Sequence, residues 1–369
     1  MKKLLYITNQ VCGAAGLERV LSIKTSYLID VFNYEIHIIT LNQKETDLFY
    51  QFHENIIYHD LELKGNPFQY IYQYITKLKT VVNKINPDII SVCDDGLKAF
   101  TLPFVLKNSC PIIYERHVSK VINLNAEKTS LLSIYKQKLT ENFMLLGAKK
   151  FDKFIVLTKD NLSEWNLDNI QVINNPLSFY PKEISNLNNK TVLAVGRQCY
   201  QKGYDRLLES WKIVTKRHPD WQLEIYGAFD KENKYHKLAK ELRVDSSVSF
   251  FKPVKNIGEV YQNASIYVMP SRFEGFGMVL IEAMAYGVPC VSFNCPCGPK
   301  EIITNNKDGF LVNNGDTKSF AAQIEKLIQD EDLRHEMGIN ARQKAGLYFP
   351  DKIVPQWDLL FQDLIKKAS

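Results

Sequence analysis

Short apolar runs rich in β-branched residues alternate with amphipathic stretches along nearly the whole chain of 369 residues. In the first half we predict strands at Lys3–Thr8, Glu35–Leu41, Asp88–Val92, Pro111–Glu115, Lys153–Leu157 and Gln171–Ile173. The pattern restarts in the second half, with predicted strands at Thr191–Gly196, Trp221–Gly227, Val248–Phe251, Ser265–Pro270, Val288–Phe293 and Gly309–Val312. Such alternation indicates parallel sheets covered by helices on both faces. Because it restarts, we predict two such sheets, each in a Rossmann-like domain.

The length also favours two domains, because a chain of this size exceeds what one hydrophobic core usually supports. A polar segment between Asn174 and Lys190 contains two prolines and shows no clear period, which is typical of a domain boundary. We therefore predict domains over residues 1–175 and 176–350, followed by an amphipathic helix over residues 351–369.

Composition excludes several classes of protein. The net charge of +5 is weak, and basic residues are not concentrated in the way that a nucleic-acid-binding protein requires. The seven cysteines are odd in number and irregularly spaced, so we expect free thiols in a reducing cytoplasm. Cys295 and Cys297 have no second Cys or His pair at zinc spacing, so we expect no metal there. No signal peptide is evident, and no apolar stretch approaches the roughly 20 residues that cross a bilayer.

The segment from Glu274 to Tyr286 places a carboxylate, Glu282, inside an otherwise apolar helical run. A carboxylate buried in such a helix is unfavourable unless a partner hydrogen-bonds to it, and a ligand hydroxyl is one suitable partner. Ahead of the run, Gly275 and Gly277 allow the backbone to approach a ligand, and the free N–H groups of a first helical turn attract anions. This combination predicts a site for a molecule that carries both phosphate and hydroxyl groups, such as a nucleotide sugar.

A second glycine-rich loop, residues 12–19, follows the first predicted strand and precedes a helix. This geometry can receive a phosphate or a sugar hydroxyl, although a purely structural turn would need the same small residues. The loop is not G-x-G-x-x-G, and Thr40 and Asn42 stand where a dinucleotide site needs an acidic residue. The sequence therefore argues against a dehydrogenase.

A third loop opens the second half of the chain and carries Arg197 and Lys202. Arg197 follows the apolar strand that ends at Val195, so it emerges at the carboxyl edge where α/β sheets bind ligands. Two cations that converge there can hold a diphosphate. Without other evidence, two cations in a loop are more often only solvated charges. Together with the glycine-rich helix start near Gly277, the loop favours the diphosphate interpretation.

The fourth predicted strand is followed by His117, which is either a hydrogen-bonded structural residue or part of a site at the carboxyl edge. Asp94 and Asp95 follow the third predicted strand, and we interpret them as solvated loop carboxylates. No Ser/His/Asp arrangement or nucleophile elbow is evident, so hydrolase chemistry has no support.

Taken together, these motifs resemble family 4 of the glycosyltransferases, which are retaining enzymes of the GT-B architecture. The resemblance implies an α/β fold with two Rossmann-like domains facing across a cleft and a C-terminal helix that crosses back to the N-terminal domain. It also implies that the first domain binds the acceptor and the second binds the nucleotide sugar. The matching motifs are Gly16-Leu-Glu-Arg-Val20, Val195-Gly-Arg197 with Lys202-Gly-Tyr-Asp205, the segment Pro270 to Ala285 with its glutamate-x7-glutamate signature, and Gly298-Pro-Lys-Glu301 with Asp308-Gly-Phe-Leu-Val312.

For the nucleotide, the resemblance assigns Glu282 to the ribose hydroxyls and assigns Arg197 and Lys202 to the diphosphate. Val254 would offer backbone groups to the base, with Gly227 beneath it. Three residues would assist at the diphosphate through their backbone, namely Gly277, Met278 and Val279.

For the sugar, the resemblance assigns Glu274, with the backbone of Gly275 and Phe276, to hydroxyls of the donor. His117 would lie against that sugar from the other domain, and Gly16 would lie near the diphosphate and the acceptor. Relatives often have two adjacent glycines where this chain has Ala15-Gly16, and the added bulk could narrow the acceptor side.

We therefore expect a retaining glycosyltransferase that moves a hexose or N-acetylhexosamine from a UDP-sugar to a glycan or lipid-linked glycan. The process would be the synthesis of a surface polysaccharide, that is, a capsule, O-antigen or exopolysaccharide. Basic side chains and a helix N-terminus would stabilise the departing diphosphate in place of a metal, and no cofactor is expected. The catalytic group would comprise Glu274, His117, Arg197 and Lys202.

Three alternatives to this interpretation stay open. The protein could bind nucleotide sugars without transferring them, or it could be a UDP-sugar epimerase of the same architecture. Glu274 could also be a covalent nucleophile, as in retaining glycosidases.

Lipid-linked acceptors are common in the family, so contact with the inner face of the cytoplasmic membrane is a further expectation. Lysines and apolar residues are interleaved between Lys120 and Lys153. This pattern fits either a membrane-surface segment or a solvated amphipathic helix.

Overall fold

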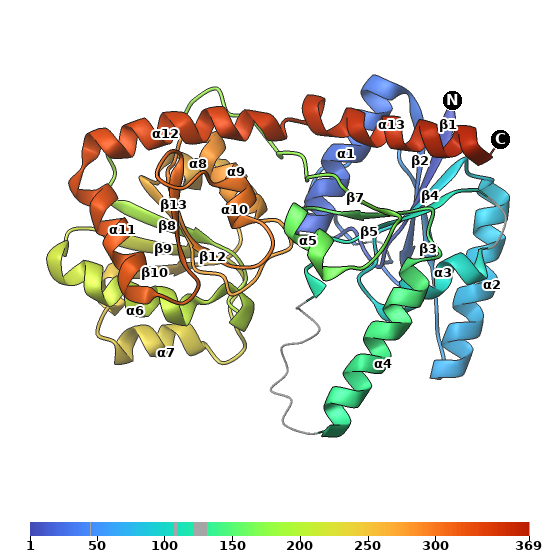
Figure 1. The fold of residues 1–369 in the computed structure, drawn as a ribbon, viewed down its shortest axis with the longest axis horizontal. Helices are drawn as coiled ribbons and strands as arrows, with labels where there is room; N and C mark the ends of the chain where they lie inside the picture. Colours follow the sequence, from blue (N-terminus) through green and yellow to red (C-terminus); the bar gives the residue numbers. More distant parts are fainter. Residues whose placement is uncertain (45, 107–109, 121–130, 369) are drawn as a thin grey trace. The chain divides into compact units, whose positions relative to one another are not determined.

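The computed structural model describes residues 1–44, 46–106, 110–120 and 131–368. The chain folds into two compact units (Figure 1). Unit 1 comprises Met1–Pro176 together with Pro350–Ser369, and unit 2 comprises Leu177–Phe349. The last helix therefore packs with the first part of the chain, although it follows unit 2 in sequence.

Unit 1 contains a seven-stranded sheet in the order β3-β2-β1-β4-β5-β6-β7, in which every pair of neighbours is parallel. Its strands are buried on both faces near the centre, as parallel sheets covered by helices require. They are β1 Lys2–Ile7, β2 Tyr34–Leu41, β3 Ile57–Leu61, β4 Ile89–Val92, β5 Ile112–Glu115, β6 Lys153–Val156 and β7 Ile170–Val172.

Helices cover both faces of this sheet, because successive side chains of each strand point to opposite faces. Leu5 and Ile7 of β1 face a core that includes Leu78 of α2, whereas Leu4 and Tyr6 face a second core. The helices of unit 1 are α1 Gly16–Phe32, α2 Pro67–Ile85, α3 Leu102–Val105, α4 Leu131–Ala148, α5 Lys159–Glu164 and α13 Pro350–Ala368.

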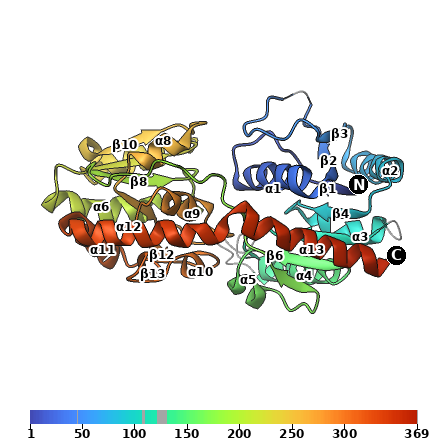
Figure 2. The ribbon, with the colours of Figure 1, turned by 90° about the horizontal axis from the view of Figure 1, so that it is seen from above.

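The C-terminal helix α13 forms part of that second core. Trp357, Phe361 and Leu364 are buried there with Leu4 and Tyr6 of β1. Figures 1 and 2 both show α13 running beside α1. The apolar face of this helix thus covers the sheet of unit 1.

Unit 2 contains a six-stranded parallel sheet in the order β10-β9-β8-β11-β12-β13. Its strands are β8 Thr191–Val195, β9 Gln222–Tyr226, β10 Val248–Phe251, β11 Ile266–Met269, β12 Cys290–Asn294 and β13 Gly309–Asn313. Its helices are α6 Tyr204–Arg217, α7 Lys234–Glu241, α8 Ile257–Gln262, α9 Met278–Ala285, α10 Pro299–Ile302, α11 Thr317–Gln329 and α12 Glu331–Ala345. The prediction of two Rossmann-like sheets is confirmed.

One strand, β3, was not predicted from the sequence. It lies at the edge of the unit 1 sheet and pairs only with β2 among the described strands. Its sequence, Ile-Tyr-His-Asp-Leu, is largely exposed and lacks the continuous apolar run that marks a central parallel strand. Edge strands bury less surface, so their sequences carry a weaker signal.

In the part of the chain that the structure describes, no helix is both long and apolar enough to span a bilayer.

The position of Trp357 predicts how much α13 contributes to the stability of unit 1. Trp357→Ala should lower the free energy of unfolding by about 3–5 kcal/mol, because it removes a fully buried ring and leaves a cavity. Leu359→Ala, on the same helix but 68% exposed, should change it by no more than about 0.5 kcal/mol. Urea unfolding followed by circular dichroism measures both, and equal effects of the two changes would contradict the packing role of α13.

Candidate functional site

Most of the expected donor-site residues of unit 2 lie on loops that follow the carboxyl ends of its strands. Because the strands are parallel, these ends lie along one edge of the sheet. Arg197 and Lys202 lie between β8 and α6, and Glu274 lies between β11 and α9. Gly227 follows β9, and Val254 lies between β10 and α8.

Lys202 and Glu274, which lie 72 residues apart in sequence, are directly bonded. Nζ of Lys202 lies 2.7 Å from Oε1 of Glu274, and both side chains are largely buried. The hydroxyl of Ser271 donates to the same carboxylate oxygen at 2.5 Å. The expected phosphate-binding cation and the expected sugar-binding carboxylate therefore belong to one cluster.

A second ion pair, not expected from the sequence, joins the Glu274 loop to the first turn of α6, directly after the Lys202 loop. The guanidinium of Arg272 bonds to both carboxylate oxygens of Asp205, at 2.9 and 2.6 Å. Although partial burial raises the pKa of Asp205, the hydrogen bond and charge of Arg272 bring it below its ordinary value. The backbone N–H of Arg272 also donates to the carbonyl of Gln201. These bonds hold the Lys202 loop against the Glu274 loop. In the sequence, the only sign of them is that Arg272 and Asp205 carry opposite charges.

Two glycines allow the loops of this edge to approach one another. A Cβ on Gly227 would lie 1.9 Å from the carbonyl oxygen of Gly196, and a Cβ on Gly298 would lie 1.9 Å from that of Phe276. Both glycines also have positive φ angles that side chains disfavour. Glycine is therefore required at both positions by close backbone contact within unit 2, whether or not a nucleotide is bound.

Helix α9 begins directly after the glutamate loop. Gly277 precedes it with φ of 101°, in the left-handed region, and Met278 and Val279 form its first turn. The N–H groups of a first turn have no partner within the helix and carry partial positive charge. The start of α9 therefore presents anion-binding groups near the Lys202–Glu274 pair.

Glu282 lies in the middle of α9 and is 0% exposed. Its carboxylate accepts hydrogen bonds from Ser178 at 3.2 Å and from Tyr261 at 3.0 Å. Protein hydroxyls thus already compensate for the burial of this charge. The burial of Glu282 therefore does not by itself indicate a ligand, and its expected role in binding ribose rests on the family resemblance.

Exposure to solvent differs among three further residues of these loops, Arg197, Gln198 and Val254. Arg197 and Val254 are exposed, and the Arg197 side chain forms no hydrogen bond or ion pair with the residues that the structure describes. Gln198 is only 4% exposed, yet neither polar atom of its amide has a partner among the described residues. Gln198 was not selected from the sequence, because glutamine in a polar loop carries no distinctive signal.

In unit 1, His117 lies two residues after the end of β5 and belongs to a buried polar cluster. Its Nε2 lies 3.3 Å from Oε2 of Glu115, which also receives Nζ of Lys24 at 2.5 Å. Burial alone would raise the pKa of Glu115, but the charge of Lys24 and the hydrogen bond from His117 lower it to about 2. Glu115 and Lys24 were not selected from the sequence.

The interpretation of Asp94 as a solvated carboxylate is wrong. Asp94 is 2% exposed, and its oxygens bond to Lys98 at 3.0 Å and to the Asn9 amide at 2.8 Å. Asp95 is partly buried and pairs with Arg116 at 3.3 Å. The lysine that neutralises Asp94 lies four residues further along the chain.

Gly16 is the first residue of α1, and an added Cβ there would meet no atom within 4 Å. The cysteines in the described residues are free thiols. Cys295 and Cys297 are buried.

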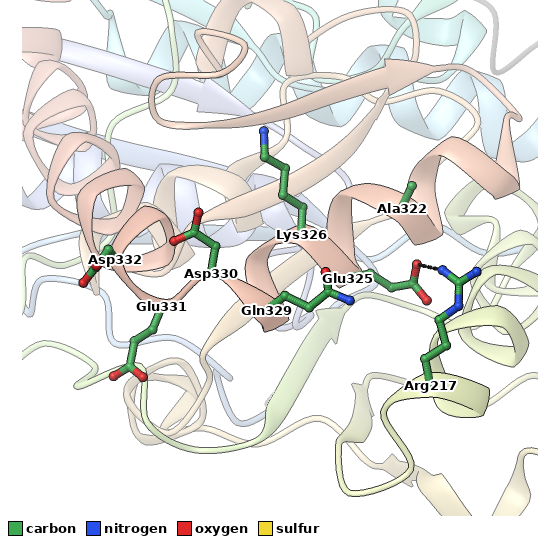
Figure 3. Close-up of a pocket in the computed structure, with 8 residues that line it drawn as sticks. All are labelled: Arg217, Ala322, Glu325, Lys326, Gln329, Asp330, Glu331 and Asp332. Carbon is green, nitrogen blue, oxygen red and sulfur yellow. Dashed lines mark hydrogen bonds and ion pairs between the residues drawn. The ribbon is translucent and has the colours of Figure 1, made fainter.

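A hollow of about 750 Å³ opens elsewhere in unit 2 (Figure 3). Arg217, at the end of α6, points toward Glu325 of α11 and pairs with it at 2.9 Å. The start of α6 follows the Lys202 loop, so the end of this helix lies away from the carboxyl edge of the sheet. The hollow is therefore separate from the candidate donor site.

Comparison with known proteins supports the family resemblance. The family model described as "Glycosyl transferases group 1" matches residues 179–344. An uncharacterized glycosyltransferase of Haemophilus influenzae is 30% identical and aligns over 97% of this chain and 99% of its own length. The amylovoran biosynthesis glycosyltransferase AmsD of Erwinia amylovora is 29% identical, over 97% of this chain and 99% of its own.

Among solved structures, a TarM mutant of S. aureus in complex with fondaparinux, alpha-GlcNAc-glycerol and UDP superimposes with a TM-score of 0.78. The match covers 98% of this chain and 100% of that chain at 17% identity, so it shows a shared fold. The fold and the paired glutamate loop thus define a GT-B glycosyltransferase. The chain belongs to the group 1 glycosyltransferases, which confirms the resemblance to family 4.

Gly298 provides a test of the loop arrangement. Gly298→Ala should destabilise unit 2 by about 2 kcal/mol or more, because the new Cβ would meet the Phe276 carbonyl and φ of 134° disfavours a side chain. Gly346→Ala is the matched control, since its nearest atom lies 3.8 Å away. Thermal unfolding measures both, and a Gly298→Ala protein as stable as the control would refute the close approach.

Proposed function

We propose that this protein transfers a hexose or N-acetylhexosamine from a UDP-sugar to a glycan or lipid-linked glycan acceptor, with retention of anomeric configuration. The observation that carries the proposal is the Lys202–Glu274 cluster beside the start of α9. Support also comes from the relative AmsD, which is named for amylovoran biosynthesis, and from TarM, which is named with UDP and alpha-GlcNAc-glycerol. We propose surface polysaccharide synthesis as the process.

The diphosphate is proposed to bind Lys202, Arg197 and the first-turn N–H groups of α9. Lys202 is held in place by Glu274, and Arg197 is exposed without a protein partner among the described residues. As the anomeric bond breaks, negative charge develops on the departing diphosphate. Cations and helix N–H groups that are already oriented stabilise this charge without reorganisation, and they take the place of a divalent metal.

Glu274 is proposed to bind hydroxyls of the donor sugar, together with the backbone of Gly275 and Phe276. Its Oε1 already receives Lys202 and Ser271, which lowers its nucleophilicity and favours binding over covalent attack. The acceptor is proposed to attack from the face that the diphosphate leaves, with a phosphate oxygen taking its proton. His117 is proposed to bind a substrate hydroxyl.

The rest of the donor is proposed to bind along the same edge of unit 2. The exposed backbone around Val254 would meet the base, and Gly227 would leave room beneath it. In unit 1, Gly16 at the start of α1 is proposed to lie near the diphosphate and the acceptor, where it leaves open space.

Removal of either proposed diphosphate cation should impair transfer. Arg197→Ala and Lys202→Ala should each lower kcat by roughly a hundredfold, in line with the loss of a charge-stabilising donor. Lys237→Ala, an exposed cation on α7, should leave kcat unchanged. Transfer from UDP-sugars to a glycan acceptor, with analysis of the sugar products, measures this effect and also detects an epimerase or a protein that only binds.

The same assay tests the metal-free mechanism. Full activity after treatment with a chelator is expected, because the cations that neutralise the diphosphate are side chains. Near-normal transfer by the Arg197 and Lys202 variants, or strict dependence on added manganese, would contradict the proposed diphosphate site.

Glu282 is proposed to bind the ribose hydroxyls, and calorimetry with UDP tests this role. Glu282→Ala should raise the Kd for UDP by about tenfold, as expected for the loss of a charged hydrogen-bonding partner. Tyr261→Phe removes one of the two protein hydroxyls that donate to Glu282 but keeps the carboxylate, so it should not weaken UDP binding. Unchanged affinity in the Glu282 variant would show that this carboxylate is only structural.

We further propose that α4 contacts the inner face of the cytoplasmic membrane. Tyr135, Leu139 and Leu146 are exposed and share one side of the helix, since they lie four and seven residues apart. Figure 1 shows α4 extending beyond the sheet of unit 1. Exposed lysines flank these residues at positions 136, 138, 149 and 150, and such lysines favour anionic lipid. Residues 121–130 of the predicted segment lie outside the described residues.

A vesicle assay tests this surface. The protein should co-sediment with vesicles that contain anionic lipid, and the double variant Leu139→Glu/Leu146→Glu should sediment much less, because charge replaces apolar contact. Leu359→Glu, an equally exposed leucine on α13, should sediment like the wild type. Failure of the wild type to bind anionic vesicles would reject the membrane contact.

A further inference from the structure

Within the buried cluster around Glu115, the family resemblance gives a role to His117 but none to Glu115 or Lys24. Glu115 is 1% exposed, and its carboxylate bonds to three side chains, from β4, from α1 and from the loop after β5. Ser91 of β4 donates to Oε1 at 2.5 Å, and Lys24 of α1 lies 2.5 Å from Oε2. His117 is the third, with Nε2 at 3.3 Å from Oε2.

The cluster also resembles a metal site, but its charge is already balanced. Ligand atoms of Cys93, Glu115 and His117 lie within 4.8 Å of one another. However, the ammonium of Lys24 already contacts Glu115, and it supplies the positive charge that a metal ion would otherwise provide. A metal would have to displace a fully buried lysine, so the cluster is better explained as an internal ion pair.

Lys24 is held from the other side by aromatic rings. Its Nζ lies 3.8 Å from the centre of the Trp357 ring and 5.1 Å from that of Tyr6. Such contacts stabilise a desolvated cation. Trp357 belongs to α13, so the last helix of the chain helps to fix a charge that lies beside His117.

The two nitrogens of His117 then have different roles. A carboxylate can only accept hydrogen bonds, so Nε2 must carry the proton that it donates to Glu115. Nδ1 of a neutral ring is then a hydrogen-bond acceptor. This atom is buried and has no partner among the described residues, so its hydrogen-bonding capacity is unused.

We propose that Lys24 and Glu115 are positioning residues that orient the His117 ring, so that Nδ1 accepts a hydrogen bond from a hydroxyl of the sugar substrate. This proposal rests on the proposed function, which gives His117 a substrate hydroxyl. Lys24 holds the carboxylate, the carboxylate holds Nε2–H, and the ring is thereby kept in one tautomer. Trp357 shields the ion pair from water.

The experiment uses a paired variant, because removal of one partner would leave a buried charge and would threaten folding. Lys24→Met with Glu115→Leu replaces both charges by apolar groups of similar size, a change that folded proteins often tolerate. The control is Lys190→Met with Asp220→Leu, which removes an exposed ion pair in unit 2.

The first measurement is the tautomer of His117 from side-chain nitrogen NMR, with the signal assigned through His117→Asn. In the wild type and in the control, we expect a single tautomer with Nε2 protonated and Nδ1 unprotonated. In the paired variant, we expect a mixture of the two tautomers. A single Nε2–H tautomer in the paired variant would overturn the proposal.

The second measurement is kcat for transfer. The paired variant should lose roughly tenfold to a hundredfold, since small misplacement of a binding group has effects of about this size. His117→Ala should lower kcat by a much smaller factor in the paired variant than in the wild type, because the ring is no longer positioned in the paired variant. Equal costs in both proteins would overturn the proposal. If His117→Ala in the otherwise unchanged protein has the wild-type kcat, the role of His117 in the proposed function is refuted. The NMR measurement of the tautomer would still test whether Lys24 and Glu115 orient the ring.

Discussion

Parallel pairing of strands is the constraint on which both units depend. A parallel sheet is buried on both faces, so its central strands are largely apolar and offer few positions for reactive side chains. Chemistry is confined to the loops at the carboxyl ends, which lie along one edge. For this reason Lys202 and Glu274 can meet at 2.7 Å although 72 residues separate them.

Charges at these edges are held by other charges from distant parts of the chain. In unit 2, the ion pair between Arg272 and Asp205 holds the loop that carries Glu274 against the start of α6, which follows the Lys202 loop. In unit 1, Lys24 and Glu115 form a pair that is almost fully buried. Buried ion pairs of this kind contribute little net stability, because desolvation offsets their attraction. Their effect is instead to restrict the geometry of the groups that they touch.

Most of the fold could be predicted because central strands and amphipathic helices have strong local patterns. The strand β3 could not, since an edge strand with Tyr58, His59 and Asp60 lacks an apolar run. The glutamate loop and the cations of unit 2 were recognised from their spacing. Asp94 was misread because its partner Lys98 became apparent only in the folded chain.

The sequence by itself determined the two α/β sheets, the family and the residue types of the candidate site, because periodicity and motif spacing are local properties. Only the tertiary structure decided which of these residues touch. It paired Lys202 with Glu274, satisfied Glu282 with Ser178 and Tyr261, and placed Lys24 between Glu115 and the Trp357 ring. Pairings of this kind depend on side-chain directions and on burial across distant elements, which no local pattern encodes.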